Sequence, residues 1–248
     1  MFQGLWKLTW LELKIFLREP MGAVTSLLIP VVMFLGLGRG VQQANKESFD
    51  ASEWIATSLP VLVIMIIALN GVVSLVTIMS IYREGGILKR LKATPLRPYT
   101  ILTAHVLVKL LLTSANILIL IIAGKTFFAI NWQGGIVGFV FAVILSTTSI
   151  LSIGFIIASM VRTARFAQMV ATMILYPLLG LSGLFVSIDE FPGVLRTLAL
   201  LSPLTHAVRL TEGAWNGEPL GNYVVSIAML VGTTIACVLL SSKVFRWE

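Results

Sequence analysis

The densest group of side chains that could do chemistry lies in residues 83–97. This segment carries five basic side chains and one acid, Glu84, between two long apolar runs. A short helix here would have an apolar face and a basic face, with two glycines before it and Pro95 ending it. Such a helix can dock in a groove of a partner protein, although composition alone favours a loop that contacts anionic lipid. Its apolar face would hold Ile87, Leu88 and Leu91, and the remainder Lys89, Arg90 and Lys92.

A second pair of titratable side chains, His105 and Lys109, lies one helical turn apart inside an apolar run. Lys109 is expected to extend back toward the lipid headgroups, which we favour over a substrate site. The other histidine, His206, is distant in sequence, and neither histidine has a cysteine or an acidic cluster nearby. No metal site is therefore expected.

Motifs for catalysis or energy conversion are not found in the sequence. Gly124-Lys125-Thr126 resembles the end of a phosphate-binding loop, but that motif needs a glycine five positions earlier, where Ile119 stands. No Asp or Glu lies deep in a predicted membrane span, which disfavours an ion-coupled carrier, a pump or a channel. The chain is therefore not expected to be an enzyme, and work for uphill transport would have to come from a partner.

The composition indicates an all-α integral membrane protein formed as a single domain over 1–248. The chain is 57% hydrophobic and 12% charged, and a soluble protein of this size would expose too much apolar surface. A membrane-crossing helix needs roughly 20 apolar residues. Six spans are predicted, at residues 21–38, 55–81, 99–124, 134–160, 168–187 and 221–242.

Charge predicts the orientation of these spans. With both termini in the cytoplasm, most of the 18 Lys and Arg residues lie on the cytoplasmic side and most acids lie outside. The net charge of +7 then reflects membrane topology, and nucleic acid is not an expected partner. Membrane lipid is.

Two further segments have distinct patterns. Residues 1–18 are predicted to contain an amphipathic helix lying in the membrane interface, with the frayed start of the first span as the alternative. Residues 188–206 contain an apolar piece too short to cross the membrane, which predicts an outer re-entrant hairpin, with an ordinary surface loop as the alternative. Before this hairpin, Tyr176-Pro177 is expected to kink the fifth span, and Gly180 and Gly183 permit close backbone approach.

Three stretches together resemble the permeases of bacterial ABC type-2 exporters, most closely the daunorubicin-resistance (multidrug) type. The resemblance covers essentially the whole chain. Val186-Ser187 and His206 depart from the pattern, which bears on the substrate subgroup and leaves the architecture unaffected. The stretches are Leu88 to Leu96, Leu181 to Phe185 followed by Phe191-Pro192, and Leu201 to Thr205, and the ending Phe245 to Glu248 is also similar.

The resemblance implies a homodimer of permeases in the bacterial inner membrane, carrying two cytoplasmic ABC ATPase subunits. ATP and Mg²⁺ would bind to the ATPase, and this chain would hold no cofactor. The cargo would be an amphipathic drug-like molecule, a lipid or a glycan. A membrane scaffold or assembly subunit that docks a cytoplasmic partner is the alternative.

The resemblance also implies roles for individual residues. The cytoplasmic coupling helix, within 83–97, would contact the ATPase, and so would the first helix through Glu12. The outer hairpin would help to close the exit. The coupling residues would be Glu84, Ile87, Leu88, Lys89, Arg90, Leu91, Lys92 and Thr94, and the outer gate residues Gly183, Phe185, Phe191, Pro192, Pro203 and His206.

Overall fold

The computed structural model describes residues 2–18, 20–44, 51–87, 98–128, 134–161, 163–183 and 188–244. Every regular element within these ranges is helical, which confirms the expected all-α class. The long helices are α1 (Phe2–Arg18), α2 (Pro20–Ala44), α3 (Ala51–Ile66), α4 (Val73–Glu84), α6 (Pro98–Phe128), α7 (Ile136–Met160), α8 (Ala164–Leu181) and α11 (Val224–Val244). The shorter elements are the π-helix η1 (Ile67–Val72), the helices α9 (Gly193–Leu201) and α10 (Pro203–Trp215), and the 3₁₀ turns η2 (Ile188–Glu190) and η3 (Leu220–Tyr223).

Five helical segments in the described ranges are long and apolar enough to cross a membrane: Ser58–Glu84, Thr103–Phe128, Ile136–Met160, Ala164–Leu181 and Leu220–Ser241. A helix satisfies its own backbone hydrogen bonds, which a membrane-spanning segment requires because lipid offers none. The protein is therefore a multi-pass membrane protein. A shorter apolar helix, Leu28–Gly40, lies where the first span is predicted, so the count of six remains a prediction.

The helix ends differ from the predicted spans by a few residues. The helix that corresponds to the third predicted span, α6, continues to Phe128, past the predicted limit at residue 124. Helix α8, which corresponds to the fifth predicted span, begins at Ala164, earlier than the predicted residue 168, and ends at Leu181. Hydropathy marks the apolar interior of a helix, whereas turns at its ends continue through polar residues such as Lys125.

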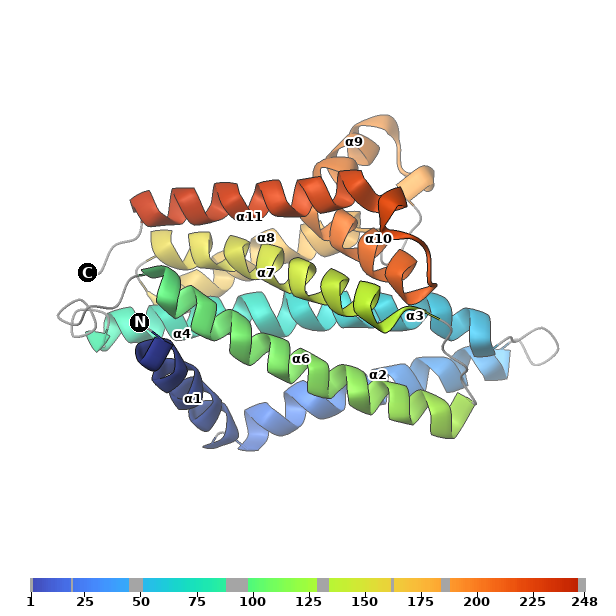
Figure 1. Cartoon of the computed structure of the whole chain (residues 1–248), viewed down its shortest axis with the longest axis horizontal. Coiled ribbons are helices and arrows are strands. Elements are labelled where there is room, and N and C mark those ends of the chain that lie inside the picture. The colour runs from blue at the N-terminus through green and yellow to red at the C-terminus, as the bar shows by residue number, and fades with distance from the viewer. Residues whose placement is uncertain are drawn as a thin grey trace.

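The long helices lie alongside one another (Figure 1). Helix α7 packs against α4, α10 and α11, and α4 also packs against α8. The first helix, α1, crosses at an angle and packs mainly on α6 (Figure 1). Helices α9 and α10 gather at the end of the bundle opposite to the N-terminus (Figure 1).

Two glycines bring α7 close to the span formed by α3, η1 and α4. A Cβ on Gly154 would lie 3.2 Å from Val72 Cγ1, and a Cβ on Gly71 would lie 3.0 Å from Leu151 Cδ2. Lipid gives no hydrophobic drive for helix association, so close contact through small residues is a main source of packing energy. These contacts fix η1 beside the middle of α7.

Candidate functional site

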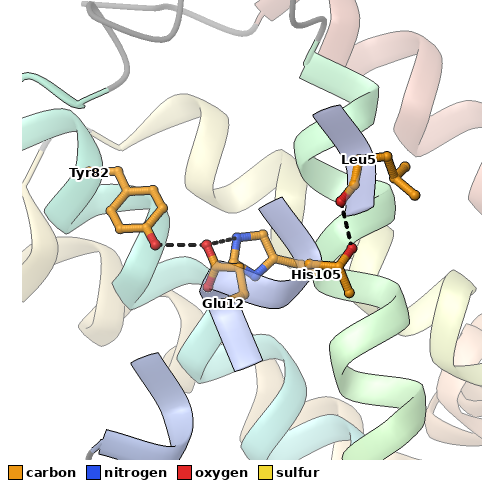
Figure 2. Close-up of polar contacts among 5 residues, drawn as sticks. Leu5, Glu12, Tyr82 and His105 are labelled. Carbon is orange, nitrogen blue, oxygen red and sulfur yellow. Dashed lines mark hydrogen bonds and ion pairs between the residues drawn. The ribbon is translucent and has the colours of Figure 1, made fainter. Parts of the chain in front are cut away.

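The first helix buries its only acid against two membrane-spanning helices. Glu12 is 4% exposed, and its Oε1 accepts a hydrogen bond of 2.7 Å from the Tyr82 hydroxyl of α4. The Nε2 of His105, on α6, lies 3.6 Å from the same oxygen (Figure 2). That distance is too long for a good hydrogen bond, and His105 Nε2 has no hydrogen-bond partner within the described residues. Glu12 thus joins α1 to both α4 and α6.

Helical periodicity explains why Glu12 points inward. Leu8 and Glu12 are four residues apart on one face of α1, and both are buried. Trp6 and Trp10 lie on the exposed side, where they are 69% and 58% exposed. A helix that exposes tryptophans and buries a carboxylate suits a membrane surface better than water.

Burial raises the pKa of the Glu12 carboxyl above its ordinary value, because the charged form loses its hydration. The hydrogen bond from Tyr82 and the positive charge of Lys109 act in the opposite direction. The resemblance predicts that Glu12 contacts an ATPase, which stays a prediction. In the structure its carboxylate contacts other helices of the same chain.

The next residue after Tyr82 binds the end of α7. Arg83 is 8% exposed, and its guanidinium donates hydrogen bonds to the carbonyl oxygens of Ser159, at 3.5 Å, and Val161. The last carbonyls of a helix have no partner within the helix, and a cation there is favoured by the helix dipole. Arg83 therefore caps the C-terminus of α7 from α4.

Glu84, the residue after Arg83, binds the start of α8. Glu84 Oε1 accepts a hydrogen bond of 2.7 Å from the backbone N–H of Ala164, the first residue of α8. Free N–H groups and the positive end of the dipole make a helix N-terminus a favourable place for a carboxylate. Three consecutive residues, Tyr82, Arg83 and Glu84, thus hold α1, α7 and α8. We call them the clamp.

The clamp overlaps the start of the predicted coupling segment, 83–97, and its last member, Glu84, is itself a predicted coupling residue. Helix α4 ends in the glycine pair, where the Gly85 N–H donates to Ile81 O and Gly86 has a φ of 67°. That left-handed conformation suits glycine at a helix end. Ile87 follows and is 38% exposed. The other predicted coupling residues lie outside the described ranges: Leu88, Lys89, Arg90, Leu91, Lys92 and Thr94.

At the other end of the bundle, His206 joins three elements. Its Nε2 lies 2.9 Å from the carbonyl oxygen of Leu200, at the end of α9, and its Nδ1 lies 3.1 Å from Ser226 Oγ, on α11. A carbonyl only accepts, so Nε2 carries the proton, and in the neutral ring Nδ1 accepts from the serine hydroxyl. Burial lowers the pKa of His206, which favours this neutral form.

The other predicted gate residues lie in or beside the same region. Pro192 and Pro203 stand at the starts of α9 and α10, where proline fits because those N–H groups have no partner within the helix. Gly183 has a φ of 85° and faces Ile188. Phe191 is partly buried beside them, and Phe185 lies outside the described ranges. The structure shows two short helices here, and their depth in the membrane remains a prediction.

Comparison with known protein families identifies the chain. Residues 3–214 match the family model of the ABC-2 type transporter, which covers most of the sequence. The chain belongs to the ABC-2 type transporter family. The resemblance seen in the coupling and gate motifs is thereby confirmed at the level of the family.

Curated relatives of this ABC-2 type chain include the following three proteins. It is 25% identical to the Probable multidrug ABC transporter permease YbhR of Escherichia coli, over 70% of this chain and 49% of the relative. It is 26% identical to the Inner membrane transport permease YhhJ of Escherichia coli, over 52% of this chain and 35% of the relative. Nodulation protein J of Rhizobium leguminosarum bv. viciae is 24% identical over 38% of this chain and 37% of the relative. The chain spans about half the length of the first of these relatives.

Sequence reasoning missed two members of the clamp in this ABC-2 type chain. Tyr82 lies just beyond the predicted span 55–81 and has no predicted role, and Arg83 enters the prediction only as a positive charge. One signal was available, because Glu12 is the only acid in α1 and acids are rarely left without a partner near lipid. The sequence offered no indication of which residue would be that partner.

Proposed function

We propose that this chain is the transmembrane permease subunit of an ATP-driven ABC exporter. Membership of the ABC-2 type family and the five candidate spans support this function. The substrate would be an amphipathic drug-like molecule, a lipid or a glycan that leaves the cytoplasm or the inner leaflet. ATP and Mg²⁺ would bind to a separate cytoplasmic ATPase subunit, present in two copies. The permease itself would form a homodimer in the bacterial inner membrane, with both termini in the cytoplasm.

The single observation that carries the proposal is the clamp. A segment that receives force from a partner must be fixed to the helices it moves, or its own displacement is lost in local bending. The residues at the start of the predicted coupling segment contact α1, α7 and α8 through Tyr82, Arg83 and Glu84. Movement of residues 85–97 would therefore pass to three helices together.

The chemistry of each contact suits this role. Arg83 and Glu84 bind helix termini, whose free carbonyl and N–H groups make charge-assisted hydrogen bonds that are stronger than neutral ones. Tyr82 binds a buried carboxylate. Displacing the end of α4 alone would leave buried polar groups without partners, which is costly in free energy, so the helices are expected to move with it.

The proposal is tested by purifying the tagged chain from its native membranes and identifying associated proteins by mass spectrometry. An ABC ATPase is expected, and its ATP hydrolysis should depend on the permease. Leu91→Asp and Arg90→Glu should abolish association, whereas the exposed outer residue Glu190→Ala should leave it unchanged. Purification of the chain without an associated ATPase would contradict the coupling assignment. Unchanged association in Leu91→Asp and Arg90→Glu would contradict it too.

The clamp is tested separately in the assembled complex. Tyr82→Phe removes one hydroxyl and leaves the aromatic ring, so the ATPase should stay bound while substrate transport per ATP hydrolysed falls. Tyr176→Phe is the matched control, because Tyr176 is 62% exposed. Equal coupling ratios in the two variants would show that the Tyr82 hydroxyl transmits no movement.

A further inference from the structure

Helix α1 exposes three basic side chains that form one row along the helix. Lys7, Lys14 and Arg18 are all exposed, and none of them forms an ion pair with a residue that the structure describes. At about 100° of rotation per residue, the three lie within about 40° of one another around the helix. At 1.5 Å per residue, they extend over about 16 Å of its length. We call these three residues the basic row.

The only acid of α1 points away from the basic row. Glu12 is buried against Tyr82 and His105, and helical rotation places it about 140° from the centre of the row. Its charge is therefore not available to neutralise the exposed cations. The exposed face of α1 carries three positively charged side chains and no negatively charged one.

Exposed apolar side chains flank the basic row on both sides. Trp6 and Trp10 lie along one edge, and Leu11 and Ile15 along the other, where they are 51% and 37% exposed. A tryptophan ring has an apolar body and a polar N–H, so it suits the depth at which lipid headgroups meet the acyl chains. Cations beside such rings are typical of helices that lie on anionic membranes.

The contacts of Glu12 place α1 level with the ends of two candidate spans. Tyr82 lies near the end of the span Ser58–Glu84, and His105 lies near the start of the span Thr103–Phe128. The ends of apolar spans mark the boundary between the acyl chains and the headgroups. Figure 1 shows α1 crossing the bundle at an angle there, so its exposed face can reach the headgroups.

We propose that the basic row binds the phosphate groups of anionic phospholipids in preference to zwitterionic ones. A basic residue close to an anionic membrane surface strengthens binding by about 1 kcal/mol, which is roughly a five-fold change in affinity. Arg18 can in addition donate two parallel hydrogen bonds to one phosphate. An acidic partner protein is disfavoured as the occupant, because the tryptophans beside the row suit a lipid boundary. This inference does not rest on the proposed transport function.

Tryptophan quenching by brominated lipids tests the proposal on the whole chain in vesicles, without an ATPase. Bromine on the acyl chains quenches a tryptophan that the lipid contacts. The vesicles hold equal parts of phosphatidylglycerol, which is anionic, and phosphatidylcholine, which is zwitterionic, and either one carries the bromine. Subtracting the signal of the double variant Trp6→Phe with Trp10→Phe leaves the fluorescence of these two residues. Phosphatidylglycerol is expected to bind beside them about five-fold more tightly than phosphatidylcholine, or better.

Salt provides a test on the unaltered protein. Raising the ionic strength from about 0.1 M to about 1 M shortens the screening length from about 10 Å to about 3 Å, so the preference should fall toward one. Equal quenching by the two lipids at low salt would overturn the proposal. A preference that persists unchanged at high salt would also overturn it, because the charges would then not be its cause.

A pair of triple variants assigns the preference to the basic row. Replacing Lys7, Lys14 and Arg18 together by glutamine should abolish the preference for phosphatidylglycerol. The matched control, Lys7→Arg with Lys14→Arg and Arg18→Lys, keeps every charge and should keep the preference. An undiminished preference in the glutamine variant would refute the assignment, and if that variant fails to fold the salt dependence of the wild type still decides. Equal lipid quenching, together with loss of a co-purifying ATPase in the glutamine variant, would assign this face to a protein partner and overturn the proposal.

Discussion

Glu84, the last residue of α4, caps the first residue of α8 by accepting a hydrogen bond from the Ala164 N–H at 2.7 Å. The two residues are 80 positions apart in sequence. Together with the adjacent contact of Arg83 to the end of α7, this bond ties the end of α7 and the start of α8 to the first residues of the predicted coupling segment. The ends of three helices are thereby joined through side chains of α4.

Removing this cap should destabilise the protein. Glu84→Ala is expected to lower the free energy of unfolding by about 1 kcal/mol, the usual contribution of a helix N-cap. Glu84→Gln should cost less, because the amide oxygen still accepts the hydrogen bond although the charge is lost. Thermal unfolding in detergent measures the effect. Glu190→Ala, at an exposed acid in η2, is the control, and equal shifts for the two alanine variants would contradict the capping role.

Burial of Glu12 predicts a pH dependence of stability. The pKa of Glu12 is raised in the folded protein above its ordinary value of 4.5, so between these two pKa values the folded state binds more protons than the unfolded state. Stability should therefore fall as the pH rises from 4.5 through the folded pKa. The groups that face Glu12 are Tyr82, His105 and Lys109.

Glu12→Gln isolates this contribution. The variant keeps an acceptor for Tyr82 and cannot titrate, so its unfolding temperature should fall less than that of the wild type across this window. The difference between the two proteins, measured at each pH, cancels the other titrating groups. Identical pH profiles would show that burial does not raise the pKa of Glu12 in the folded protein. Glu190→Gln provides a variant with the same chemical change at an exposed site.

The sequence predicted the helices of this protein better than it predicted the contacts between them. Long apolar runs determine membrane spans almost by themselves, because lipid excludes other backbone structures. The bond between Tyr82 and Glu12 joins residues 70 positions apart, and no local pattern specifies such a pairing. The same is true of the bond between Glu84 and Ala164, and the predicted contact of Glu84 with a partner protein stays a prediction.

The π-helix was beyond sequence reasoning for a different reason. Residues 67–72 read Ile-Ala-Leu-Asn-Gly-Val, which is compatible with an ordinary α-helix in an apolar run. Whether an extra residue is accommodated there depends on packing against α7 through Gly71 and Gly154. His206 shows the opposite case, since a resemblance placed it in the outer region and the structure adds its bonds to α9 and α11.

His206 predicts a second pH effect with the opposite sign. Burial lowers its pKa below the ordinary value of 6.5, so between the two pKa values the unfolded state binds more protons than the folded state. Stability should be fully present above pH 6.5 and should be lost as the pH falls below it. The loss has a structural cause, since a protonated ring no longer accepts from Ser226.

His206→Gln should lower the unfolding temperature at pH 7.5 and should also reduce its fall between pH 6.5 and pH 5. The charged groups nearest to His206 include Arg209 on the same helix, which also lowers the pKa of His206. A variant whose unfolding temperature falls with acid as steeply as that of the wild type would show that His206 does not titrate as described.

The packing of Tyr223 on α10 gives a prediction in which one substitution changes sign with its background. A Cβ built on Gly213 would lie 2.2 Å from Tyr223 Cζ, and the tyrosine is held in place because its hydroxyl donates to Glu218 Oε2 at 2.8 Å. Gly213→Ala should therefore destabilise the protein by about 1–3 kcal/mol, the usual cost of overpacking. When Tyr223→Ala removes the ring, the same change should become stabilising by up to about 1 kcal/mol, because alanine is the better helix former. Gly232→Ala on α11, where nothing lies within 4 Å, should be stabilising by up to about 1 kcal/mol in either background. Unfolding temperatures of the four combinations measure the reversal, and an equal loss from Gly213→Ala with and without the ring would show that the tyrosine is not the obstacle.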